Sequence, residues 1–132
     1  MLSLLSRAAY HNLLDATVLQ PNNPTATAIV YLSSERSPQV ITRAEFQQMV
    51  KRYAAFFQQQ GIQPCDLLII AHTQNLESIY AFWGAMHIGA IPSMFPTLTE
   101  KLDADIYMRQ MAELVRLSNV KAILTTPEFA AS

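Results

Sequence analysis

Few residues of this chain have the types and spacing that catalysis or metal binding requires. The three histidines, His11, His72 and His87, are far apart, and no set of histidines, cysteines and carboxylates has the spacing of zinc ligands. The serines at 33–37 lack the G-x-S-x-G pattern of a nucleophile elbow. Cys65 is followed by an aspartate, which disfavours the thiolate that a catalytic cysteine needs. We therefore expect no catalytic residue and no metal site in this sequence.

One loop is a candidate for contact with a ligand. It consists of His72, Thr73, Gln74 and Asn75. It directly follows the apolar run at 67–71, which is typical of a central parallel strand, and ligands of open α/β sheets bind beyond the carboxyl ends of strands. Two plainer roles compete with ligand binding: a solvated loop histidine, and capping of the next helix by Thr73 or Asn75. A second loop, at 95–99, is a weaker candidate.

The apolar patterns predict the elements that would position these loops. Strand-length apolar runs alternate with stretches of helical spacing, which predicts a mostly parallel sheet with helices on both faces. The expected strands are 28–32, 39–41, 67–71, 91–95 and 121–125, and the expected helices are 3–14 and those beginning at Thr42, at Asn75 and at Asp103 or Asp105. We expect the first two strands to form a hairpin at one edge of this sheet, and Pro127 to begin an exit loop.

Two helices carry specific local predictions. Thr42 and Glu45 fit a capping box, and that helix should end at Gly61, since glycine is favoured just after a helix. The helix after Asn75 is apolar nearly all round, as in helices buried on every side. Gly84 inside it costs about 1 kcal/mol relative to alanine, which close approach of a neighbouring backbone would explain.

Composition excludes several classes of protein. The chain is 51% hydrophobic and only 14% charged, so we expect much of its surface to be covered by something else. A net charge of -1 without a basic stripe argues against nucleic-acid binding. No apolar run approaches the roughly 20 residues of a membrane span. The single cysteine and the absence of a secretory signal favour a cytoplasmic location.

Glycine is scarce, and its positions bear on nucleotide binding. The three glycines, Gly61, Gly84 and Gly89, are dispersed along the chain. Phosphate-binding loops need clustered glycines, because the backbone N–H groups must approach the phosphate closely. We therefore expect no cofactor-binding residue of that kind in this segment.

A series of short segments follows in a distinctive order. Residues 41–46 read ITRAEF and residues 61–66 read GIQPCD. Asn75 and Glu77 precede the apolar helix, Gly89-Ala90 and Pro92 follow it, and residues 121–126 read KAILTT. In this order the segments resemble the early core of adenylate-forming enzymes, the AMP-dependent acyl-CoA synthetase and ligase superfamily. The resemblance covers about residues 28–125. It departs at Arg43, where an aromatic residue is usual, at Cys65, where glycine is common, and at Pro92, which comes early.

The resemblance implies a fold and a domain organisation. The fold would be a partial N-terminal subdomain of the adenylate-forming ligase fold. Residues 1–132 would form a single α/β domain, the N-terminal part of a larger AMP-binding ligase, with a helix and loop at 1–25. Its partner would be the remainder of its own chain, and its exposed apolar face would favour self-association.

The resemblance also implies a reaction for the parent enzyme. The parent would use ATP and Mg²⁺ to convert a carboxylate to an acyl-adenylate, then transfer the acyl group to the thiol of CoA or phosphopantetheine. The family's phosphate loop, ribose-binding aspartate and catalytic lysine have no counterpart up to Ser132, so we expect the chain alone to be inactive. Two other functions remain open: a stand-alone flavodoxin-like interaction module, and a small-ligand binder that uses the loops at His72 and Phe95.

Overall fold

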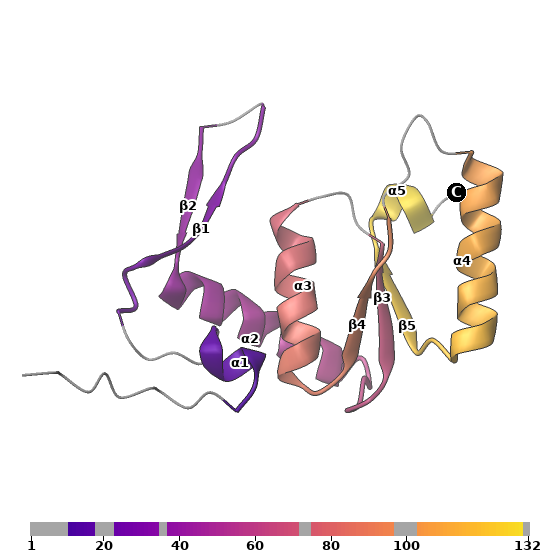
Figure 1. Cartoon of the computed structure of the whole chain (residues 1–132), viewed down its shortest axis with the longest axis horizontal. Coiled ribbons are helices and arrows are strands. Elements are labelled where there is room, and N and C mark those ends of the chain that lie inside the picture. Colours follow the sequence, from indigo (N-terminus) through magenta and orange to yellow (C-terminus); the bar gives the residue numbers. More distant parts are fainter. Residues whose placement is uncertain (1–10, 18–22, 35–36, 72–74, 97–102, 131–132) are drawn as a thin grey trace, which may run out of the picture.

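The computed structural model describes residues 11–17, 23–34, 37–71, 75–96 and 103–130. Helices and strands alternate along most of the chain (Figure 1). In order, the elements are α1 (Leu13–Ala16), β1 (Thr27–Tyr31), β2 (Gln39–Thr42), α2 (Arg43–Gln59), β3 (Leu67–Ala71), α3 (Leu76–His87), β4 (Ile91–Met94), α4 (Ala104–Ser118), β5 (Ala122–Thr125) and α5 (Pro127–Ala130).

A three-stranded parallel sheet lies at the centre of the fold. Its order is β4-β3-β5, and both neighbours run parallel to β3. Leu68, Ile69 and Ile70 of β3 are almost completely buried, because helices cover both faces of this strand. The apolar run at 67–71 therefore forms the central parallel strand that its composition predicts. Pro92 lies in β4, an edge strand of the described sheet, where a missing backbone N–H is tolerated.

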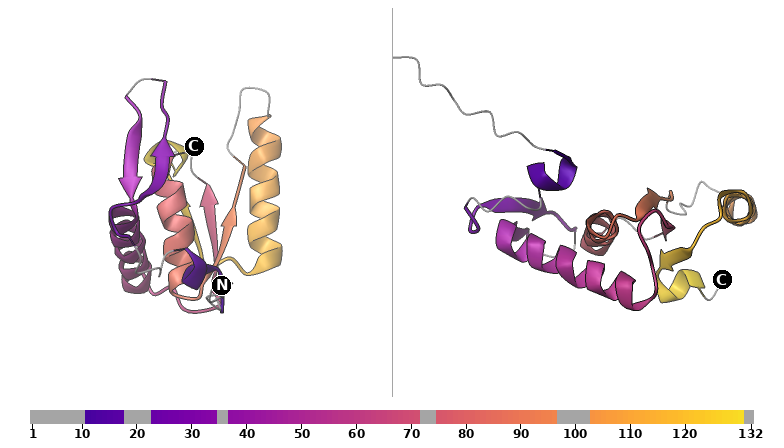
Figure 2. Two further views of the ribbon diagram at one scale, coloured as in Figure 1. Left: turned by 60° about the vertical axis from the view of Figure 1, so that its left-hand side comes forward. Right: turned by 90° about the horizontal axis from the view of Figure 1, so that it is seen from below.

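The two crossover connections place helices on opposite faces of this sheet. From β3 the chain passes through α3 to β4, and from β4 it passes through α4 to β5, on the other side of β3. Right-handed crossovers in opposite directions put α3 and α4 on opposite faces. Figure 2 shows α2 and α3 on one side of the sheet and α4 on the other.

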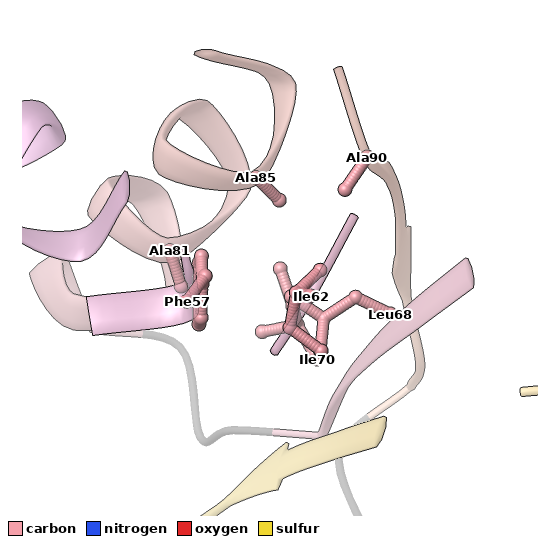
Figure 3. Packing of buried hydrophobic residues seen from close by; sticks show 7 residues of the cluster. All are labelled: Phe57, Ile62, Leu68, Ile70, Ala81, Ala85 and Ala90. Carbon is pink, nitrogen blue, oxygen red and sulfur yellow. The ribbon is translucent and has the colours of Figure 1, made fainter. Parts of the chain in front are cut away.

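Each face of the sheet has its own core. Between the sheet and helices α2 and α3, the buried residues are Phe57, Ile62, Leu68, Ile70, Ala81, Ala85 and Ala90 (Figure 3). On the opposite face, Ile69 and Ala71 of β3 pack with Tyr107 and Met111 of α4. Because successive residues of a strand point to opposite faces, β3 contributes alternately to the two cores.

The hairpin of β1 and β2 is a separate sheet, and the prediction that it adds to an edge of the parallel sheet is wrong. Within the described ranges, the two strands pair only with each other, in antiparallel fashion. Ile41 of this hairpin packs in a third cluster with Phe46 and Val50 of α2 and Tyr80 of α3. The hairpin thus covers the side of the two helices that faces away from the parallel sheet, where it cannot reach a sheet edge (Figure 1).

The predicted start and end of α2 are confirmed. The Thr42 hydroxyl accepts a hydrogen bond from the Glu45 backbone N–H at 3.3 Å, and the Thr42 backbone N–H donates to the Glu45 carboxylate at 2.8 Å. This reciprocal pair satisfies two backbone donors that no helical carbonyl can reach. At the other end, Gly61 has φ +79°, a left-handed conformation that glycine adopts without strain.

Three other predictions need correction. The described part of the 3–14 region is helical only from Leu13, because Asn12 is extended and caps α1; residues 1–10 lie outside the described part. Helix α3 is not buried on every side, since Ile79, Trp83 and neighbours keep partial exposure. Pro127 begins α5 rather than an exit loop, because a proline at the first helical position needs no backbone N–H partner.

A helix that crosses a membrane must be both long and apolar. Within the described ranges, no helix is long and apolar enough to cross a membrane.

Candidate functional site

The carboxyl ends of the three parallel strands form the candidate site. Strand β3 ends at Ala71, with β4 on one side and β5 on the other. The chain changes direction across the sheet between β3 and β5, so this is the topological switch point at which ligands of α/β sheets bind. The Thr125 hydroxyl donates a hydrogen bond to the Ala71 carbonyl at 3.1 Å, which joins the two strand ends at that point.

The loop that follows β3 is only partly described. His72, Thr73 and Gln74 lie outside the described residues, so their predicted ligand-facing role stays a prediction. Asn75 is described, and it caps α3. Its side-chain carbonyl accepts from the Ser78 N–H at 3.0 Å, and its backbone carbonyl accepts from the Ser78 hydroxyl at 2.8 Å. Of the two plainer roles that the sequence left open, helix capping is therefore the one that Asn75 performs.

The loop after β4 is fastened to α4 by Tyr107, a residue that the sequence analysis did not single out. The Tyr107 hydroxyl donates to the Pro96 carbonyl at 2.7 Å, and its ring meets the Phe95 ring edge-on at 5.1 Å between centroids. Burial of the tyrosine raises the pKa of Tyr107 above its ordinary value. The sequence does not indicate that a tyrosine in an amphipathic helix has such a hydrogen-bond acceptor. The Tyr107 hydroxyl reaches the Pro96 carbonyl only when α4 packs against the sheet.

An open cavity of about 670 Å³ lies beside the first residues of α3, Leu76 and Glu77. Its lining brings Ser33 and Ser37, from the connection between β1 and β2, together with Glu77 of α3. Tyr31 and Gln39 add further polar groups, and no lysine or arginine is among the described lining residues. Hydroxyls beside a carboxylate favour a ligand that donates hydrogen bonds. A phosphate group would instead need cations or clustered N–H groups in the lining.

The described residues do not form a metal centre or a phosphate cradle. No group of histidine, cysteine, aspartate and glutamate in the described part of the chain could hold a metal ion. Gly61 and Gly89 lie just after helices with positive φ, and Gly84 is enclosed between helices. His87 is the last residue of α3, and its buried Nδ1 has no hydrogen-bond partner among the described residues.

Comparison with known proteins agrees with this architecture. The family model of AMP-binding enzymes matches residues 18–132. Over 56 residues, 42% of this chain, the sequence is 38% identical to 4-coumarate–CoA ligase 2 of Nicotiana tabacum. The fold is similar to a fatty acid AMP ligase of Legionella pneumophila, with a TM-score of 0.65 and 23% identity over 82% of this chain. It is also similar to an acyl-CoA synthetase of Brucella canis, with a TM-score of 0.70 and 18% identity over 84%.

The matches cover most of this chain but little of its relatives. The chain spans 10% of the tobacco ligase, 18% of the Legionella enzyme and 19% of the Brucella enzyme. Its fold is the N-terminal part of the adenylate-forming ligase fold. The ordered motifs, the βαβ arrangement around β3 and the family match over residues 18–132 agree, and the chain belongs to the AMP-binding enzyme family.

Proposed function

We propose that this chain is the N-terminal scaffold portion of an ATP-dependent acid–thiol ligase. One observation carries the proposal: the fold matches adenylate-forming ligases over 82% of this chain but over only 18% of a full ligase. Residues 1–132 would then be one α/β unit of the larger enzyme, with 1–25 as its N-terminal helix and loop. The parent would be cytoplasmic and would convert a carboxylic acid to an acyl-adenylate and then to a thioester.

The parent reaction uses ATP, Mg²⁺ and CoA or phosphopantetheine, and the described residues of this chain do not fit those groups. Carboxylates that could gather around a metal ion are missing from the described part, and the glycines are occupied in helix ends and helix packing. We therefore propose that the chain alone is inactive. It would supply packing surface against which other parts of the ligase build their pockets.

The distribution of exposed apolar side chains supports a partner that covers this chain. Val30 and Val40 lie opposite each other on the outer face of the hairpin, each 55% exposed. Phe56 of α2 and Ile123 of β5 are also exposed, along a groove of about 260 Å³ between these two elements. Apolar surface of this kind marks interaction sites. We propose that the remainder of its own chain covers it in the parent, and that no nucleic acid binds.

Without that cover, the 132-residue chain should self-associate. Sedimentation velocity over a concentration series should show a dimer or larger species that dissociates on dilution. Replacing both Val30 and Val40 by lysine should shift the species toward monomer, since two like charges on opposite residues oppose packing. Gln48→Lys, at an exposed position of α2, is the control and should leave association unchanged. A wild-type chain that stays monomeric at all concentrations would contradict this part of the proposal.

The native mass of the protein tests the scaffold assignment directly. An antibody raised against this chain should detect, in the source cells, a species several-fold heavier than 14.8 kDa. A native species of about 14.8 kDa would overturn the scaffold assignment and favour an independent interaction module.

Inactivity of the isolated chain has its own assay. The purified 132-residue protein should catalyse no ATP–pyrophosphate exchange with any carboxylic acid tested, while the full-length parent should catalyse it with its own acid. If exchange activity separates from the chain on gel filtration, it belongs to a contaminant and the chain is inactive. Exchange activity that co-elutes with the chain would refute the proposal.

We also propose that the loop of His72, Thr73, Gln74 and Asn75 faces a ligand in the assembled parent. Its place at the switch point beyond β3 supports this role. His72→Ala in the full-length ligase should raise KM for one substrate with little change in kcat, because a binding contact is lost. Unchanged KM for acid, ATP and thiol would argue that the histidine is only solvated.

A further inference from the structure

The outer edge of β4 lacks a backbone donor. The Ile91 N–H donates to the Asp66 carbonyl at 2.8 Å, just before β3 begins. The Phe95 N–H donates to the Ile70 carbonyl of β3 at 3.0 Å. Because alternate residues of a parallel strand bond to the same neighbour, Pro92 turns away from β3, and there it has no N–H to offer. A proline in this position hinders the addition of a further strand.

The outer edge of β5, in contrast, keeps its backbone groups. The Lys121 N–H donates to the Leu67 carbonyl at 2.9 Å, toward β3. By the same alternation, Ala122 and Leu124 turn their N–H and C=O groups outward. Among the described residues, β5 pairs with β3 alone (Figure 1). Residues 122–125 include no proline and no charged side chain, so this edge is open to another strand.

Apolar side chains flank the open edge on both faces of the sheet. On the face covered by α2, Phe56 is 46% exposed and borders the groove of about 260 Å³ beside β5. On the face covered by α4, Ile123 is 41% exposed, in register with Ile69 of β3. A strand added at this edge would cover Phe56 and Ile123 while its backbone pairs with β5, as in recognition by strand addition.

The sequence of β5 is complementary to itself when two copies run antiparallel with Ile123 opposite Ile123. Each Leu124 then faces Ala122 of the second copy, so a large side chain lies across from a small one, beside the groove. Each Lys121 faces Thr125 of the second copy, which keeps the two lysines apart. A parallel pairing in register would instead place the two lysines side by side.

We propose that two copies of this chain dimerise by antiparallel pairing of their β5 strands, which joins the two parallel sheets into one. Ala122 of each copy exchanges N–H···O=C hydrogen bonds with Leu124 of the other, and the two Ile123 side chains meet at the centre. The interface consists of one short strand pair with its flanking side chains, so the dimer is weak and reversible. The proposal concerns the 132-residue chain and is independent of the ligase assignment.

Sedimentation velocity of a Val30→Lys, Val40→Lys protein tests the proposal, because this background removes association through the hairpin. Over a concentration series, the background protein should still form a dimer that dissociates on dilution. Ile123→Lys in this background should weaken the dimer about tenfold or more, since like charges would lie opposite each other. Ile123→Glu should do the same. An equimolar mixture of the two variants should restore the dimer, because lysine then faces glutamate.

Two further variants separate the two edges of the sheet. Ala122→Pro removes an outward N–H without adding charge, and it should weaken the dimer about tenfold. Met94→Lys is the control: Met94 is 50% exposed at the end of β4, so the same charge is placed on the other outer strand and should leave the dimer unchanged. Thermal unfolding checks that each variant keeps its fold. If an Ile123 variant unfolds, the comparison of Ala122→Pro with Met94→Lys decides.

Four results would overturn the proposal. The first is a background protein that stays monomeric at every concentration. The second is a dimer that survives Ile123→Lys or Ala122→Pro in a folded protein. The third is a dimer that Met94→Lys weakens as much as Ile123→Lys does, which would indicate general charge repulsion or pairing at β4. The fourth is a mixture of the lysine and glutamate variants that stays monomeric, because Ile123 would then not lie opposite itself.

Discussion

Gly84 of α3 lies directly against Tyr53 of α2: a Cβ added at position 84 would lie 2.6 Å from the Tyr53 Cβ and 3.1 Å from the Ala54 backbone nitrogen. The two helices therefore approach backbone to backbone, as predicted from the glycine alone. Part of the obstruction is backbone, which cannot rotate away. This contact holds the helix pair that covers one face of the parallel sheet.

Gly84→Ala should destabilise the fold although alanine is the better helix former. Overpacking costs about 1–3 kcal/mol and the gain in helix propensity is about 1 kcal/mol, so we expect a net loss of up to about 2 kcal/mol. Urea unfolding measures it. The reverse substitution, Ala55→Gly at an exposed site of α2, measures the effect of helix propensity alone. It should lower the free energy of unfolding by about 1 kcal/mol. A stability gain in Gly84→Ala would contradict the close approach.

Cys65→Gly should stabilise the protein. Cys65 has φ +69°, a left-handed conformation that costs a residue with a side chain roughly 1–2 kcal/mol, while its backbone N–H donates to the Gly89 carbonyl at 2.8 Å. Glycine relieves this strain but loses more backbone entropy on folding. We therefore expect the free energy of unfolding, measured with denaturant, to rise by about 0.5–1 kcal/mol. Cys65→Ala keeps the strain and should give no gain. Equal stability of the two variants would show that the backbone conformation is not the cause.

The capping box should make part of the stability depend on pH. The backbone N–H of Thr42, and then its hydroxyl at 2.7 Å, donate to the Glu45 carboxylate and lower the pKa of Glu45 below its ordinary value. A depressed folded-state pKa contributes stability above the unfolded-state pKa of about 4.3, and that stability is lost as the pH falls through the folded-state pKa.

Comparison with Glu45→Gln isolates this effect, because every other carboxylate is common to both proteins. The unmodified chain should be the more stable at pH 6–7, and the difference should shrink as the pH falls below about 4. Thermal midpoints at several pH values give the curve. A difference that stays constant with pH would rule out ionisation of Glu45 as its origin.

Tyr107→Phe should cost about 1–2 kcal/mol of stability. It removes the hydroxyl that bonds the Pro96 carbonyl and leaves that acceptor without its partner. Tyr107→Leu should cost more, because it also removes the edge-on contact with Phe95, worth about 0.5–1.5 kcal/mol beyond area burial. Denaturant unfolding of both variants separates the contribution of the Tyr107 hydroxyl to stability from that of its ring. A Phe variant as stable as the original would show that the hydrogen bond contributes nothing.

Local patterns in the sequence were enough to predict most elements. The capping box at Thr42, the cap at Asn75 and the strand at Leu67–Ala71 all appear as predicted. These features depend on a few adjacent residues, whose hydrogen bonds and periodicity act within one element. The helix that Pro127 begins was missed, because proline is compatible with both a loop and a first helical turn.

The sequence by itself determined most of the elements, their alternation and membership in the AMP-binding enzyme family, because periodicity, caps and ordered motifs are local. Tertiary structure alone decided that the hairpin packs on α2 and α3 instead of on the sheet edge. It also decided that Tyr107 meets Pro96. Those contacts join residues far apart in the chain, and they depend on how helix and sheet faces fit together, which no local pattern encodes.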